Sequence, residues 1–308
     1  MRSILILLLI VFVLSSTCAR NMTLNQHWKI WKNQFNKSYP NVEERLRRVI
    51  WENNLKTVEE YNRQADVGIY TYWLGMNQFE DLTNEEFVKL LNGFHNWRDK
   101  GVVVPVKDQG QCGSPWAFAA VGSIESAYAI KTEKLVSLSE QQLIDCSTLL
   151  GNRGCYGGSM TVAFQYIQEV GGIEASDTYP YKAIENTCTF NTSKVVVRLC
   201  GSVNISFGSE AALQQAVALL KPVAASVDAS QNSFQFYKSG VYNEPDCSQT
   251  KLDYSMLIIG YGNESGKDYW LLKNSWDVGC GAQGYIKMTR NRNNQCGIAT
   301  LASYPILC

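Results

Sequence analysis

The chain has 308 residues, of which 45% are hydrophobic and 18% are charged, a composition typical of globular proteins and unlike that of disordered chains. Its 28 basic and 28 acidic residues give a formal net charge of zero, and no Lys/Arg cluster stands out. A nucleic-acid or anionic-membrane partner usually requires a basic excess, so we expect neither. The sequence carries no metal or nucleotide motif, and we expect no cofactor.

Residues 1–19 have the pattern of a secretory signal peptide. Arg2 precedes a purely apolar run from Ile4 to Leu14, and Thr17 and Ala19 supply the small residues that cleavage prefers. This run is too short for the roughly 20 residues that a membrane span requires, and no later run reaches that length. We therefore predict a secreted or endolysosomal protein without a membrane span.

The ten cysteines agree with an oxidising compartment, and nine remain once Cys18 leaves with the signal peptide. None of them belongs to a Cys-x-x-Cys pair, which argues against a zinc site or a thioredoxin-type site. Candidate glycosylation sequons begin at Asn21, Asn36, Asn191, Asn204 and Asn263.

Residues from about 25 to 90 are predicted to be helical, with many charged and aromatic side chains. One set of residues recurs at spacings of three and four, which places the set on one helix face. Its members are Glu43, Arg47, Trp51, Asn54, Val58 and Asn62. By spacing alone, this face indicates only an amphipathic helix that packs on another element.

The next motif is Gly75-x-Asn77-x-Phe79-x-Asp81, after which Thr83 and Glu86 predict a capping box at the start of another helix. The helical face and this motif together resemble the Glu-Arg-Phe-Asn-Ile-Asn and Gly-Asn-Phe-Asp signatures of cathepsin L-like propeptides. In the first signature, Trp51 and Val58 replace Phe and Ile. The resemblance implies a propeptide domain that packs on a protease and blocks its cleft.

The junction after this domain is unusually short. We expect a propeptide inhibitor-like domain over residues 20–95 and a papain-like peptidase domain over residues 96–308. Asn96-Trp97-Arg98, which resembles the start of a mature enzyme, follows Phe87 after only a few residues. Ten residues span at most about 35 Å, so little chain is left to cross a cleft and offer a cleavage site. Two interpretations stay open: maturation is abandoned, or the sequence lacks an exon.

From Trp97 to Pro305 the chain resembles cathepsin L-like enzymes of the papain family. The segments that carry the resemblance are 109–114, 116–118, 139–146, 154–158, 227–230, 234–237, 274–276 and 296–299. The apolar run from residue 116 to about 130 predicts a helix, and residues 252–259 predict a strand. The resemblance implies an α+β, papain-like fold of two lobes, one helical and one β-barrel-like, with a cleft between them.

The family's chemistry needs a Cys thiolate at a helix N-terminus, a His that shares its proton, an Asn that orients the His, and a Gln in the oxyanion hole. By resemblance, these positions are Pro115, Tyr254, Asn274 and Gln109. Pro115 carries no nucleophile, although Pro suits the first turn of a helix behind Ser114 as the N-cap. A tyrosine hydroxyl titrates near pH 10 and is a poor base, so we interpret Tyr254 as filling the cleft.

A check that is independent of the resemblance comes from the histidines. The chain has only His27 and His95, both before Trp97, so the peptidase-like domain contains none. Neither Ser114 nor Cys280, which replaces a Trp of the family, can therefore pair with a histidine base inside that domain. We expect an inert or disulfide-bonded Cys280 and a pseudoprotease that has lost its catalytic centre.

By resemblance, three disulfides are expected: Cys112–Cys155, Cys146–Cys188 and Cys247–Cys296. Cys200, Cys280 and Cys308 remain, so at least one thiol is free or pairs between chains.

Parts of a peptide-binding cleft also resemble the family. Gly157 and Gly158 match backbone that pairs with an extended peptide. Met160, Met256 and Ala302 match positions that line the main specificity pocket, with ordinary core packing as the alternative.

Three functions stay open. The favoured one is an inactive homologue with a peptide-binding, protein-binding or regulatory role, whose partners are its own propeptide domain and a ligand in the cleft. The second is an active secreted or lysosomal cysteine endopeptidase whose sequence is misreported. The third is a structural matrix protein that assembles through its remaining cysteines.

Overall fold

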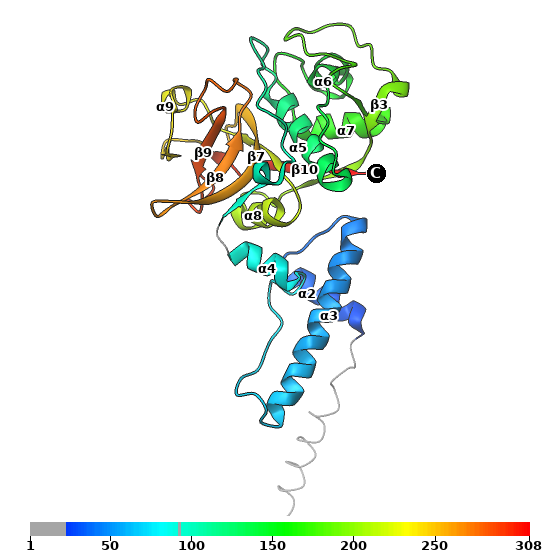
Figure 1. Ribbon diagram of the computed structural model, residues 1–308, viewed down its shortest axis with the longest axis vertical. Helices are drawn as coiled ribbons and strands as arrows, with labels where there is room; N and C mark the ends of the chain where they lie inside the picture. Colours follow the sequence, from blue (N-terminus) through cyan, green and yellow to red (C-terminus); the bar gives the residue numbers. More distant parts are fainter. Residues whose placement is uncertain (1–22, 92–93) are drawn as a thin grey trace, which may run out of the picture. The chain divides into compact units, whose positions relative to one another are not determined.

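The computed structural model describes residues 23–91 and 94–308 (Figure 1). The chain forms two compact units that meet in sequence between Phe87 and Val88. The predicted signal peptide lies outside the described residues. A search of the described helices for one that is long and apolar enough to cross a bilayer finds none.

The first unit contains α2 (Leu24–Gln34), α3 (Asn41–Asp66) and the first half of α4 (Asn84–Leu91). The capping box predicted for α4 is confirmed: Thr83 N donates to Glu86 Oε2 across 2.8 Å, and Glu86 N donates to Thr83 Oγ1 across 3.2 Å. Such reciprocal bonds satisfy amide groups that the first helical turn leaves unpaired.

The predicted helical face lies along α3, where it organises the core of the first unit. Trp51 packs with Trp28 and Trp31 of α2 in a buried aromatic cluster. Arg47 is buried and donates from Nη1 to both carboxylate oxygens of Glu86, each across 3.0 Å. Asn54 donates to the carbonyl oxygens of residues 80 and 82, so hydrogen bonds join the helix of the first signature to the segment of the second.

The second unit contains five α-helices, four 3₁₀ helices and ten strands among its described residues. The helices are α5 (Pro115–Thr132), α6 (Glu140–Cys146), α7 (Met160–Val170), α8 (Glu210–Leu219), α9 (Asn232–Gln235), η1 (Trp97–Lys100), η2 (Thr148–Leu150), η3 (Thr192–Lys194) and η4 (Gln295–Gly297). The strands are β1 (His95–Asn96), β2 (Ile173–Glu174), β3 (Val195–Val197), β4 (Leu199–Asn204), β5 (Val223–Val227), β6 (Val241–Tyr242), β7 (Tyr254–Glu264), β8 (Lys267–Lys273), β9 (Tyr285–Thr289) and β10 (Leu301–Leu307).

Eight of these strands form one sheet in the order β4-β10-β5-β7-β8-β9-β6, with β1 paired to β7. Every strand pair of this sheet is antiparallel except β6 and β9. Figure 1 shows this sheet on one side of the second unit and α5, α6 and α7 on the other. Two separate hydrophobic cores fill the two sides, so the α+β, two-lobe architecture expected from the resemblance is confirmed.

Helix α5 confirms the predicted apolar helix and lies where the two lobes meet. Most of its residues are buried on every side, which explains why its sequence lacks a polar face. A Cβ atom at Gly122 would lie 2.9 Å from Leu257 Cδ2 of β7, so the glycine permits a close approach of α5 to the sheet. The strand predicted at 252–259 is found as β7, which begins two residues later, at Tyr254, and runs on to Glu264.

The three disulfides implied by the resemblance are confirmed. A fourth joins Cys200 of β4 to Cys308 at the end of the chain. Among the described cysteines, Cys280 is the free one, and its side chain is exposed. Of the two alternatives for Cys280, the unpaired thiol is therefore the one observed.

Candidate functional site

A groove of about 500 Å³ runs between the two lobes. The helical lobe contributes Gly113, Pro115, Trp116 and the loop at residues 153–158, and the β lobe contributes Ser226 and residues 252–255. Gln109 also lines the groove. Gln109, Pro115 and Tyr254, three of the four residues that the resemblance assigned to a catalytic centre, therefore lie along one concave surface, and Asn274 lines neighbouring cavities.

Pro115 occupies the first position of α5, at the floor of this groove. Pro is favoured there because its fixed φ suits a helix and its missing N–H would be unpaired in the first turn. Ser114 occupies the N-cap position as expected, but its hydroxyl makes no capping bond. Instead, the buried Ser114 Oγ lies 3.0 Å from the Tyr181 hydroxyl and 3.3 Å from the Cys112 carbonyl oxygen. The side chain is turned into the helical lobe, away from a nucleophile's position.

Tyr254 begins β7, and its hydroxyl group lies at the centre of a hydrogen-bond cluster. It is 2.8 Å from Asn274 Oδ1, 3.0 Å from Gln109 Oε1 and 3.3 Å from Ser275 Oγ. Tyr254 lines the groove, and beyond the interpretation that it fills the cleft, its phenol contacts both the retained Gln and the retained Asn. Three segments far apart in sequence meet at this one oxygen.

The protons in this cluster can be assigned from the distances. Ser275 N donates to Asn274 Oδ1 across 2.8 Å, which fixes the oxygen of that amide toward Tyr254. A phenol has one proton, and the shorter of its two contacts to amide oxygens is the one to Asn274. Ser275 Oγ donates to Gln109 Oε1 across 2.7 Å, and Gln109 Nε2 donates to the Cys112 carbonyl oxygen across 3.0 Å.

Aromatic rings cover this cluster on the β-lobe side. The Tyr254 ring lies 5.1 Å from the Trp276 ring and 6.0 Å from the Phe234 ring, centroid to centroid. Burial among these groups raises the pKa of the Tyr254 phenol well above its ordinary value. Tyr254 is therefore a neutral donor at acid and neutral pH and has no proton-accepting role there.

Sequence reasoning missed Ser275 as a member of the site. Its side chain is buried, and its hydroxyl contacts Gln109 and Tyr254. Its backbone carbonyl also accepts from Gln109 N across 2.9 Å. The position directly after Asn274 was the signal that could have drawn attention to it.

The glycine pair lies on the groove as predicted. A Cβ atom at Gly158 would lie 2.6 Å from the Trp116 ring and 2.6 Å from Asn152 Oδ1, so the backbone rests directly on the indole. Within the described chain, neither the N–H nor the C=O of Gly158 forms a hydrogen bond. These groups are free to pair with an extended peptide.

The predicted specificity-pocket residues are only partly placed at the groove. Met160 starts α7, and its sulfur accepts from the groove residue Ser226 across 3.7 Å. Met256 and Ala302 both pair with Ala225 and lie in the β-lobe core, in line with the alternative of ordinary core packing. Side chains alternate along a strand, so the groove-facing positions are one residue away on each strand.

The groove-lining residues on these strands are Ser226 of β5 and Ser255 of β7. Ser226 pairs with Ser255 on β7 and with Leu301 on β10. The two serine hydroxyls lie 3.2 Å apart. Leu252 lines the groove beside them. The pocket wall is therefore more polar than a methionine-lined one.

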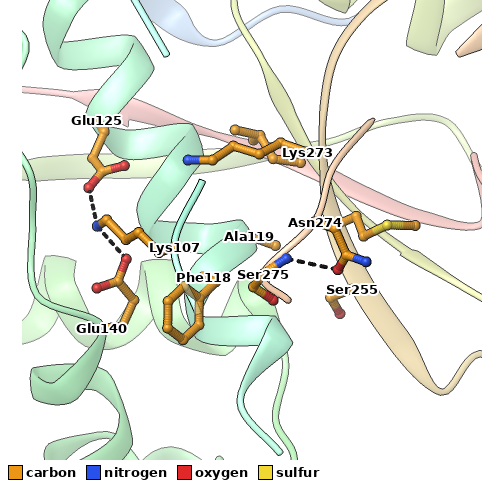
Figure 2. Close-up of a pocket in the computed structure, with 11 residues that line it drawn as sticks. Lys107, Phe118, Ala119, Glu125, Glu140, Ser255, Lys273, Asn274 and Ser275 are labelled. Carbon is orange, nitrogen blue, oxygen red and sulfur yellow. Dashed lines mark hydrogen bonds and ion pairs between the residues drawn. The ribbon is translucent and has the colours of Figure 1, made fainter. Parts of the chain in front are cut away.

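A buried ionic cluster lies behind Asn274, around a cavity of about 10 Å³ (Figure 2). Lys107 Nζ lies 2.8 Å from Glu125 and 2.6 Å from Glu140. Lys273, which ends β8, points toward α5, and its amino group pairs with no other group in the described structure. Burial lowers the pKa of the Lys273 ammonium to about 8, against the opposing effect of Glu125.

Comparisons with known proteins agree with this geometry. Residues 92–306 match the papain family cysteine proteases, and residues 28–87 match the cathepsin propeptide inhibitor domain (I29). The chain belongs to the papain family.

Within that family, similar relatives include digestive cysteine proteinase 2 of Homarus americanus. It is 47% identical over 91% of this chain and 94% of its own length. A cathepsin L-like peptidase of Aedes aegypti is 44% identical over 98% and 99%. A solved structure of digestive procathepsin L 3 from Tenebrio molitor has a TM-score of 0.67 and 40% identity, covering 93% of this chain and all of that one.

Proposed function

We propose that this papain-family chain is a catalytically inactive homologue that binds extended peptides or protein segments in its inter-lobe groove. The observation that carries the proposal is Pro115 at the first position of α5, across the groove from Tyr254, with no histidine among the residues that line this groove. The histidine of the second unit, His95, pairs instead with Tyr261 on β7. Cysteine-protease chemistry needs a thiolate and a base, and neither position supplies one. In a comparable triad, loss of the nucleophile or the base alone lowers the rate by about 10⁶-fold.

The groove is suited to binding because the disulfides and backbone groups that shape it are retained, although the catalytic residues are replaced. Two disulfides, Cys112–Cys155 and Cys146–Cys188, brace the helical lobe beside it. Gly158 presents unpaired backbone groups, whereas Asn274 Oδ1 accepts from Tyr254 and Gln109 Oε1 accepts from Ser275. The signal-peptide pattern and the four disulfides support a secreted or endolysosomal location for this role.

The test has two parts. Hydrolysis of a fluorogenic dipeptide substrate is measured at acid and neutral pH for the parent chain and for the Pro115→Cys, Tyr254→His double variant. Binding of labelled extended peptides to the parent is measured in parallel by fluorescence anisotropy. We expect no hydrolysis by the parent, measurable hydrolysis by the double variant, and saturable peptide binding to both.

Each part can contradict the proposal separately. Hydrolysis by the parent, after contaminating protease is excluded with a cysteine-protease inhibitor, would show that the centre is active by another route. Absence of any peptide binding to a correctly folded parent would rule out the groove as a binding site. In that case a role for the exterior surface, including the exposed Cys280, becomes the better explanation.

A further inference from the structure

Two charged side chains line the groove, and they differ in the contacts that they make within the protein. Asp253 lies on the β-lobe wall, where its Oδ1 already accepts from Ala229 N across 2.8 Å. Arg153 lies on the helical-lobe wall with an exposed side chain. Its guanidinium makes no ion pair or hydrogen bond with any group that the structure describes. The groove therefore offers one uncommitted positive charge.

The loop that carries Arg153 holds this charge in a defined place. Arg153 N donates to the Gly157 carbonyl oxygen, and Tyr156 N donates to the Arg153 carbonyl oxygen, each across 2.8 Å. The Cys112–Cys155 disulfide anchors the loop, and Cys155 N donates to Glu185 Oε1 across 2.7 Å. These bonds hold the loop on both sides, so the backbone of Arg153 has a defined position on the groove wall.

The guanidinium also lies next to the backbone that a peptide would use. Arg153 Nη2 is 3.8 Å from the position that a Cβ atom on Gly157 would occupy, directly before the unpaired Gly158. Tyr156 is 82% exposed on the same loop and offers a large ring surface. A side chain of an extended peptide paired with Gly158 would therefore pass within reach of the guanidinium.

We infer that the groove selects extended peptides that carry an acidic side chain at the position facing Arg153. A guanidinium binds a carboxylate through two parallel N–H···O bonds, which gives both attraction and orientation. This inference rests on the proposed function, because it assigns the class of ligand taken by the same groove. It concerns Asp or Glu side chains in peptides or protein segments.

The test uses the purified full chain and sets of short fluorescein-labelled peptides. Within each set one position is Asp, Asn or Lys, and this position is moved along the peptide. We expect one position at which Asp binds about two- to fivefold more tightly than Asn, with Lys the weakest. The difference should shrink at high salt, because exposed charge pairs are screened.

Variants then assign the preference to one residue. Arg153→Gln should abolish the difference between Asp and Asn, and Arg153→Glu should reverse the order so that Lys is favoured. Arg292→Gln, which neutralises an exposed arginine outside the groove, should leave the preference unchanged. All three substitutions lie at exposed positions, so the fold should tolerate them.

The possible results distinguish a failure of this inference from a failure of the proposed function. Peptides that bind equally well with Asp, Asn and Lys, or a preference that survives Arg153→Gln, would overturn the inference and leave groove binding intact. Failure of every peptide to bind would overturn the proposed function, and the inference with it.

Discussion

The Tyr254 hydroxyl lies 2.8 Å from Asn274 Oδ1, so the side chain at the base position is bonded to the Asn that would orient a base. The same hydroxyl reaches Gln109 on the other side. These polar groups form contacts with one another in a partly buried position, where an unpaired polar group would destabilise the folded state. The former catalytic positions therefore form a structural cluster that ties β7, the 274–276 segment and the loop before α5 together.

Tyr254→Phe should lower the free energy of unfolding by about 1 kcal/mol, because it removes the hydroxyl and leaves Asn274 Oδ1 with one partner fewer. Urea unfolding followed by tryptophan fluorescence measures this loss. Tyr156→Phe is the matched control, since it removes an exposed hydroxyl and should have an effect near zero. Equal stabilities for the two variants would show that the cluster contributes nothing measurable.

Pro115→Cys alone should give a thiol without protease activity. The α5 N-terminus lowers a thiol pKa only modestly, and Tyr254 cannot hold the positive charge that a histidine would place beside it. Rates of iodoacetamide alkylation against pH, in a Cys280→Ser background, report the thiol pKa. We expect a value near 8 for Pro115→Cys and below about 6 once Tyr254→His is added. Identical titrations would mean that residue 254 does not reach the thiol.

Stability should rise with pH between about 8 and 10.5 because of Lys273. Its pKa is lowered to about 8 in the folded chain from an ordinary 10.5, so across this window the unfolded chain binds more protons than the folded one. The penalty for the buried charge is fully present below pH 8 and is relieved as the pH rises. Its full size is on the order of 3 kcal/mol.

Lys273→Met tests this linkage. The variant should be more stable than the parent at pH 7, and most of the difference should disappear by about pH 10. Urea unfolding at several pH values gives the comparison, with Lys194→Met as an exposed-lysine control. A Lys273→Met chain that is less stable than the parent at every pH would show that the ammonium is favourably solvated or paired.

Arg47→Met should destabilise the propeptide inhibitor domain by about 3 kcal/mol. The substitution leaves Glu86 without its main cationic partner and removes the bond to the Asp81 carbonyl oxygen. Hydrogen exchange of α3 amides should accelerate. Arg63→Met, which removes an exposed arginine of the same helix, should leave that exchange unchanged. Similar exchange in both variants would contradict the assigned role of Arg47.

Local sequence patterns were sufficient to predict much of the fold. The Thr83–Glu86 capping box depends on four consecutive residues, and α5 is marked by an apolar run with Pro115 at its start. The same holds for β7, where apolar β-formers follow one another. In each case the information lies within one element, so the pattern and the structure agree.

The site was harder to predict because its contacts are long-range or depend on strand register. Tyr254 and Gln109 are 145 residues apart in sequence, and their polar contact exists only after the two lobes assemble. The position of Met256 and Ala302 in the core was hard to predict for a different reason. A displacement of one residue moves a strand side chain to the other face, and a resemblance without the pairing register does not fix that residue.

The pairing of β1 with β7 has a consequence for processing. His95 and Asn96 pair with Tyr261 and Gly260, directly before the segment that resembles the start of a mature enzyme. A cutting enzyme needs an accessible, extended stretch of chain, and strand pairing limits that access. A cut within β1 is therefore expected to wait for transient opening of this strand pair.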